Sequence, residues 1–133
     1  MYLHRLGNEQ KMLFLELAQQ FVYVDEVFSE HEKQVIKAYC QEMGIDNIDC
    51  KPGNKAETIE KVMNICSKDD GKIIIFELIG LGLIDGTYDS QERKFVSEIS
   101  KIIGITDEYC NACEIAINDY MNIQERFNRL VIS

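Results

Sequence analysis

Apolar residues recur three and four positions apart along most of this chain, which is the spacing of one face of an α-helix. In the first such stretch Leu13, Leu17, Phe21 and Val24 lie on one line, flanked by further apolar residues. No stretch of the chain gives a persuasive strand pattern. The spacing predicts six helices, over residues 8–24, 29–43, 54–66, 72–84, 89–103 and 106–130.

The fourth stretch has two interpretations. The run 73–76, Ile-Ile-Ile-Phe, taken alone is typical of a buried strand, but its length together with the following residues favours a helix. Because this helix is apolar nearly all round, we expect it to lie at the centre of the fold, after a break at 67–71. Gly80 and Gly82 each cost about 1 kcal/mol inside a helix, which suggests that another backbone passes close to them.

Residues that favour helix ends accompany these stretches. Ser29 with Glu32 has the form of a capping box, in which each side chain satisfies the other residue's backbone amide. Gly44 is expected to end the second helix in a left-handed conformation. We also predict helix starts at Asn54 (with Glu57), Asp89 and Thr106, and inward-facing side chains that include Met63 and Ile102.

Two parts of the chain follow the same order at a constant offset of 60 positions, without a gap. Each part has an apolar run, an Asp, an aromatic residue, a capping residue, an acid and a second apolar run ending in Gly-Ile. The identical positions are Asp25 and Asp85, Glu32 and Glu92, Gly44 and Gly104, and Ile45 and Ile105. We therefore predict one all-α domain over 1–133: a bundle of about six helices built from two pseudo-symmetric helix-loop-helix repeats (12–45 and 72–105), followed by a C-terminal helix (106–130).

Composition narrows the partners. The chain has 133 residues and a formal charge of −9, from 14 basic and 23 acidic residues. An acidic protein repels phosphate backbones, so we expect no nucleic-acid binding, while basic protein surfaces and metal cations are more natural partners. The start of the chain lacks a signal-peptide pattern, and the most apolar window, 73–84, contains Glu77 and is too short to span a bilayer. An odd count of five cysteines shows no disulfide framework, so we expect a cytoplasmic protein.

The acidic residues between paired helices are the candidate metal ligands. Asp25 and Asp85 fall at the C-terminal ends of helices, where negative charge is unfavourable and something must offset it. Free amides between the helices or a basic residue such as Lys33 or Arg93 would do so, and so would a cation. A divalent cation of the Ca²⁺ or Mg²⁺ type would do so, because such ions take several oxygen ligands. The candidate ligands are Asp25, Glu32, Asp85, Asp89 and Glu92. The alternative is that these carboxylates only cap helices, and the sequence leaves both interpretations open.

An EF-hand does not account for this segment. Asp85, Thr87 and Asp89 occupy the first, third and fifth places of such a loop. The sixth place should be Gly and is Ser90, and the twelfth should be Glu and is Val96. A cation bound here would need another geometry.

The repeated segment resembles the signature of TerB-like (tellurite-resistance) domains. That signature has Asp-Gly near the end of an apolar helix, then an aromatic residue, a capping residue, a Glu, and a helix ending in Gly-Ile. Residues 83–92 fit it, whereas the first copy has Glu26 where Gly is usual. The resemblance covers roughly residues 12–120. It implies an all-helical bacterial domain linked to tellurite and other chemical stress or to phage defence, with metal binding proposed through the acidic residues.

Other chemistry has little support. Cys110 and Cys113 form a lone CxxC within a helix, and a metal or redox role would need further ligands or an activated thiolate. No phosphate-binding loop or nucleophile with a neighbouring His is present, so we predict no enzyme. The leading hypothesis is a TerB-like protein-interaction module, and the alternative is a cation-binding or sensing protein. Excess apolar residues over 121–131 suggest a partner helix or a homodimer, and peripheral membrane association stays open.

Overall fold

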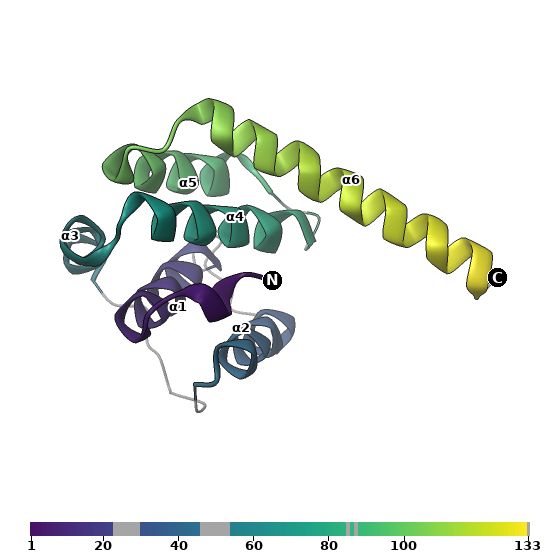
Figure 1. The fold of residues 1–133 in the computed structure, drawn as a ribbon, viewed down its shortest axis with the longest axis horizontal. Helices are drawn as coiled ribbons and strands as arrows, with labels where there is room; N and C mark the ends of the chain where they lie inside the picture. The colour runs from purple at the N-terminus through teal and green to yellow at the C-terminus, as the bar shows by residue number, and fades with distance from the viewer. Residues whose placement is uncertain (23–29, 46–53, 85, 87, 133) are drawn as a thin grey trace.

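The computed structural model is built of helices (Figure 1). It describes residues 1–22, 30–45, 54–84, 86 and 88–132, and these contain no strand. The elements in chain order are the 3₁₀ turn η1 (Leu3–Arg5), α1 (Asn8–Val22), α2 (Glu30–Met43), α3 (Lys55–Ile65), α4 (Lys68–Ile84), α5 (Ser90–Ile103) and α6 (Asp107–Val131). The all-α prediction is therefore confirmed. Within the described residues no helix has both the length and the apolarity that crossing a bilayer requires.

Helix α4 lies at the centre, as its all-round apolarity predicts. It packs against α1, α5, α6 and η1, and its buried side chains include Ile74, Ile75, Leu78 and Ile79. Figure 1 shows α5 and α6 on one side of α4 and α1 and α2 on the other. The strand interpretation of 73–76 is wrong, because these residues lie within α4, whose buried side chains pack against helices on both sides.

The start of α4 differs from the prediction. The helix begins at Lys68, so the expected break at 67–71 is mostly the first turn of the helix. Ser67 and Asp70 form a reciprocal cap: the Ser67 amide donates to Asp70 Oδ2 (3.3 Å) and the Asp70 amide donates to Ser67 Oγ (3.1 Å). Gly71 is buried, and a Cβ there would lie 2.5 Å from the Ile103 side chain. This glycine allows close packing and does not mark a loop.

The glycines later in α4 also have a cause other than the predicted one. A Cβ at Gly82 would lie 2.7 Å from Tyr88 Cδ1 and 3.1 Å from Phe21 Cζ. Two aromatic rings approach this position, not another backbone. At Gly80 the nearest such atom is Ile117 Cδ1, at an ordinary contact distance of 3.8 Å.

Helices α2 and α5 end in the same way. Gly44 and Gly104 have φ of 70° and 89°, in the left-handed region predicted for helix-ending glycines. The amides of Ile45 and Ile105 donate to the carbonyls of Cys40 and Ser100, at 2.9 and 2.8 Å, which is the long hydrogen bond of a Schellman motif. Both helices have 14 residues, and they begin 60 positions apart. Helices α1 and α4, of 15 and 17 residues, also begin 60 positions apart.

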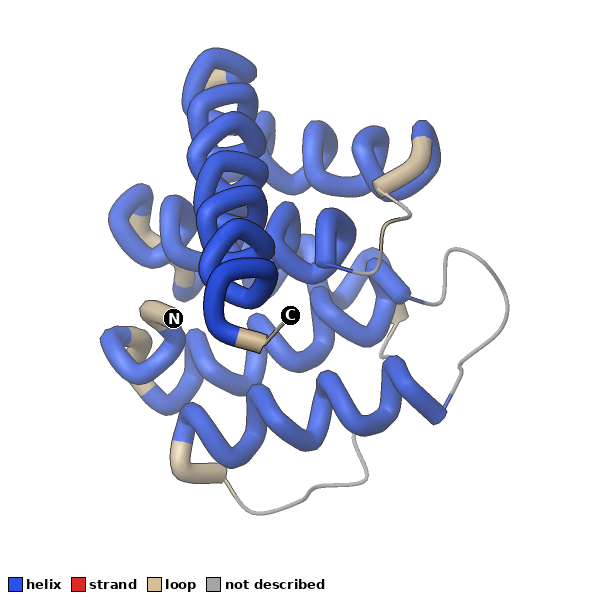
Figure 2. The backbone as a smooth tube through the Cα atoms, turned by 90° about the vertical axis from the view of Figure 1, so that its right-hand side faces the viewer, coloured by secondary structure: helices blue, strands red, loops and turns tan. Residues whose placement is uncertain are grey.

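The core is continuous through the bundle, and α6 alone extends beyond it. The largest fully buried side chains come from η1, α1, α4 and α5. Figure 2 views the bundle from the end toward which α6 points, with the last turns of this helix nearest the viewer. Two predicted core positions are wrong: Met63 is 69% exposed and Ile102 is 36% exposed. Each lies at the edge of an apolar stripe that is wider than the neighbouring helix can cover.

Candidate interaction surface

Almost none of the described residues covers the C-terminal half of α6. The helix packs chiefly on α4, and its buried residues are Cys113 and Ile117, both in the first half. Every residue from 122 to 132 is exposed. A helix without buried contacts normally presents polar residues to water, whereas this one presents Ile123, Phe127 and Leu130.

Exposed apolar side chains concentrate in this region. The described residues expose twelve large apolar side chains, and ten of these lie on or just after α6 or line the groove beneath it. The ten are Met1, Tyr2, Ile84, Ile115, Tyr120, Ile123, Phe127, Leu130, Val131 and Ile132. Single exposed apolar residues are common on protein surfaces, but a contiguous group marks an interaction site.

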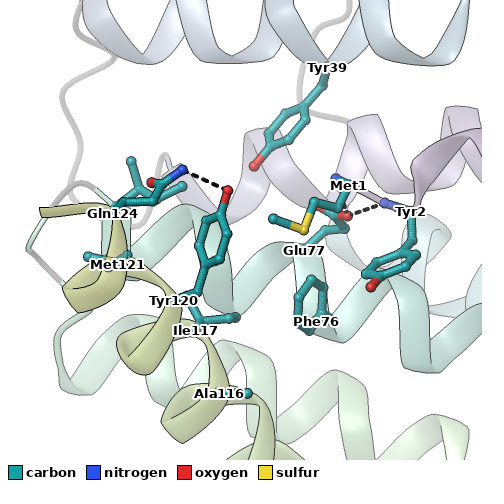
Figure 3. A pocket seen from close by; sticks show the side chains of 12 residues that line it. Met1, Tyr2, Tyr39, Phe76, Glu77, Ala116, Ile117, Tyr120, Met121 and Gln124 are labelled. Carbon is teal, nitrogen blue, oxygen red and sulfur yellow. Dashed lines mark hydrogen bonds and ion pairs between the residues drawn. The ribbon is translucent and has the colours of Figure 1, made fainter. Parts of the chain in front are cut away.

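The groove beneath α6 is an apolar cavity of about 390 Å³ (Figure 3). Its walls come from the N-terminal segment, α2, α4 and α6, and they are Met1, Tyr2, Tyr39, Phe76, Glu77, Gly80, Ile84, Ala116, Ile117, Tyr120, Met121 and Gln124. The α6 side chains at one wall, including Tyr120 and Gln124, lie opposite Met1 and Tyr39 in Figure 3. We call this cavity the α6 groove. Its apolar lining suits an apolar side chain better than a charged ligand.

Among the described residues that line the groove, Glu77 is the only carboxylate, and it already accepts two hydrogen bonds. It is 6% exposed, and its Oε1 accepts hydrogen bonds from the Met1 ammonium at 2.7 Å and the Tyr2 amide at 2.8 Å. Burial lowers the pKa of the ammonium, but hydrogen bonds to Glu77 and Glu42 outweigh burial and raise the pKa above its ordinary value. Tyr2 also packs edge-on against Phe76, with 5.5 Å between ring centroids. Glu77 therefore holds the N-terminal segment in place as a groove wall.

Three polar contacts set the direction of α6. Thr106 caps the helix, as predicted, by accepting from the Tyr109 amide at 3.2 Å. The Tyr109 hydroxyl donates to the Lys72 carbonyl at 2.8 Å, which ties the first turn of α6 to α4. Arg93 donates two hydrogen bonds to Glu114, at 2.9 and 2.6 Å, which ties α6 to α5. The exposed half of α6 thus extends from a well-anchored first half.

The predicted metal ligands are only partly described. Asp25 and Asp85 lie outside the described residues, and Glu32 belongs to α2 without a described side chain. Asp89 and Glu92 form a capping box: the Glu92 amide donates to Asp89 Oδ1 at 2.8 Å, and the Asp89 amide donates to Glu92 Oε1 at 3.2 Å. Across 1–22, 30–45, 54–84, 86 and 88–132, no three potential metal-ligating side chains cluster.

A second, smaller cavity of about 290 Å³ lies between α5 and α6. Its one cation, Arg93, is paired with Glu114, and its guanidinium stacks 4.3 Å from the centroid of the Tyr88 ring. Burial raises the pKa of Tyr88 to about 12, so the phenol stays protonated. The described lining of this cavity therefore offers an anion no positive charge that is not already paired with a carboxylate.

The two cysteines of the CxxC lie on the first half of α6. Cys113 is buried, and burial raises the pKa of its thiol. Cys110 Sγ lies 3.3 Å from Ser100 Oγ. Both are free thiols that fill the space between α6 and its neighbours, and a reactive thiolate needs the opposite environment.

Sequence reasoning identified the excess apolar residues of 121–131 but missed the groove. The available signal was the apolar pair Met1 and Tyr2 at the start of the chain, which have no helical stripe to join. No family model, curated protein or solved structure matches this chain.

Proposed function

We propose that this protein is a non-enzymatic helical module that acts by binding another polypeptide along α6 and the groove beneath it. The observation that carries the proposal is that, of the twelve large apolar side chains exposed among the described residues, ten concentrate in that region. Covering them would remove a large apolar area from water, at about 25 cal/mol per Å². A helix laid in an apolar groove is a recurring way to do so.

We further propose that the fold is a pair of pseudo-symmetric helical hairpins, α1–α2 and α4–α5, of the TerB-like type. The helix starts 60 positions apart and the two matching Schellman ends support this assignment. A TerB-like identity would place the protein in the cytoplasm of a bacterium, in a response to chemical stress or phage. The motif over residues 83–92 is the basis for that part of the proposal.

Binding of a divalent cation by the acidic inter-helix segments is the competing function. Its ligands would be Asp25, Glu32, Asp85, Asp89 and Glu92. Two of these, Asp89 and Glu92, already satisfy each other's backbone amides at the start of α5. That arrangement supports the capping role, so we rank the cation function second.

Site-specific photo-crosslinking in the cells that produce the protein tests the interaction function. A photoreactive amino acid replaces Ile123, on the apolar face, or Glu125, on the opposite face of the same turn. Light-dependent adducts are expected from position 123 and not from position 125. Equal adducts from both positions, or none from 123, would refute the proposed surface.

A further inference from the structure

The exposed face of α6 carries the repeat of a coiled coil. Ala116, Tyr120, Ile123, Phe127 and Leu130 are spaced alternately four and three residues apart. At about 100° per residue, they stay within about 40° of one line along the helix. All five are exposed, Tyr120 and Ile123 by 45% each, Phe127 by 58% and Leu130 by 81%. We call these five residues the α6 seam.

We propose that the α6 seam pairs with the seam of a second copy of this chain, in antiparallel orientation, and that the partner helix covers the α6 groove. This proposal names the partner of the surface described under the proposed function and rests on that function. A second copy is favoured over other partners by three features of the chain: seam size, flanking charge and the position of the groove.

Seam side chains are complementary in size only in one orientation. With the twofold axis near residues 121–122, Ala116 lies opposite Phe127 of the second copy and Tyr120 lies opposite Ile123. The smallest seam residue, Ala116, then accommodates a large ring in two of the layers, and Leu130 has no seam residue opposite it. A parallel pair would set Phe127 against Phe127 and Ala116 against Ala116, which gives one crowded layer and one empty layer.

Charges beside the seam select the same orientation. Asp119 and Arg126 flank it on one side, one position before Tyr120 and Phe127. In an antiparallel pair the residues at this flanking position face each other, so Asp119 of each copy meets Arg126 of the other. Within the part of the chain that the structure describes, neither side chain forms an ion pair. A parallel pair would place Asp119 beside Gln124 and Arg126 beside Val131, with no charge complementarity.

The groove lies on the other flank of the seam. Ala116, Ile117, Tyr120 and Gln124 line both the groove and this side of α6. A partner helix running antiparallel along the seam in this register brings its residues 119–127 past residues 116–124, directly over the groove. The partner's Phe127, which lies opposite Ala116, can then fill apolar space that is otherwise open to water. The twofold axis repeats this contact at the other end, so both grooves are covered.

Sedimentation equilibrium of the purified full chain, from 1 to about 100 μM at low salt, tests the pairing. We expect a concentration-dependent species of twice the chain mass. Asp119→Arg and Arg126→Asp should each weaken dimerisation about tenfold, since each turns two attractions into repulsions. The double variant Asp119→Arg/Arg126→Asp should restore the dimer to within about threefold of wild type.

Phe127→Asp should abolish the dimer with an unchanged helical spectrum, because Phe127 lies outside the bundle. Met63→Asp, an exposed apolar position on α3, is the matched control and should leave the dimer intact. If Asp119→Arg/Arg126→Asp does not restore the dimer, the antiparallel pairing is overturned.

Other results separate this inference from the proposed function. A chain that stays monomeric at 100 μM, while position 123 crosslinks to a protein of another mass, would overturn the second copy and keep the interaction surface. Monomeric protein that instead floats with phosphatidylglycerol vesicles would assign the seam to a lipid surface and overturn the inference. A monomer without adducts from position 123 would overturn both proposals.

Discussion

The start of α5 offers a direct test of whether its carboxylates serve the helix or an ion. Asp89 accepts a hydrogen bond from the Glu92 amide at 2.8 Å, and Glu92 is 5% exposed. Asp89→Ala removes the cap and should cost about 1 kcal/mol of unfolding free energy. Asp89→Asn removes the charge but keeps a good capping oxygen, so it should cost only a few tenths of a kcal/mol.

These free energies translate into measurable melting temperatures. For 133 residues the unfolding entropy is about 280 cal/mol/K, so 1 kcal/mol shifts Tm by about 3–4 °C. Asp89→Ala should therefore melt about 3–4 °C below wild type and Asp89→Asn within about 1 °C. Circular dichroism at 222 nm follows the transition, with urea titrations to confirm that the slope is unchanged.

The same melts decide the cation question. A cation held at 100 times its Kd would stabilise the fold by about 2.7 kcal/mol, which corresponds to about 10 °C. If the carboxylates only cap the helix, Ca²⁺, Mg²⁺, Mn²⁺ and EDTA should all leave the wild-type Tm unchanged. The reasoning is refuted if Asp89→Asn is as damaging as Asp89→Ala and the wild-type Tm rises with one of these ions. Such a result would mean that the negative charge, not the capping oxygen, is required.

Three further predictions concern packing, an ion pair and a thiol. Gly82→Ala should destabilise the fold by about 1–3 kcal/mol, because two aromatic rings occupy the space that the new Cβ would need. Gly80→Ala should stabilise the fold by up to about 1 kcal/mol, because its Cβ would make only ordinary contacts. Equal changes in the free energy of unfolding in urea would contradict this packing. The hydrogen bond from Arg93 lowers the pKa of Glu114, so their coupling should be present above the unfolded pKa of about 4.3 and disappear as pH falls through the folded value. A double-mutant cycle should give about 0.5–1 kcal/mol at pH 7 and none at pH 2, and persistence at pH 2 would exclude an ionic origin. Iodoacetamide should alkylate Cys113 at least about tenfold more slowly in the native chain than in guanidinium, because burial raises its pKa and blocks access; equal rates would place the thiol at the surface.

Much of the helical architecture is predictable because helix formation and helix ends depend on nearby residues. The left-handed ends at Gly44 and Gly104 and the caps at Asp89 and Thr106 each involve atoms within five residues of one another. The predicted start of α4 is wrong because a glycine usually marks a break between helices. Gly71 is instead required by the side chain of Ile103, which lies 32 positions away in the sequence. No local pattern distinguishes a glycine required by a distant side chain from one that ends a helix.

The candidate interaction surface also has a part that local sequence predicts and a part that depends on tertiary packing. Sequence alone determined that α6 is a helix and that its C-terminal half carries more apolar residues than the core needs. Both follow from the spacing of residues along one helix, which is a local property. The tertiary structure decided which of those residues stay exposed, because burial depends on where α4 and α5 end and on how the first half of α6 is anchored. It alone also brought Met1 and Tyr2 to Glu77, across more than 70 positions, and so formed the groove. Contacts of that separation depend on how the whole core packs.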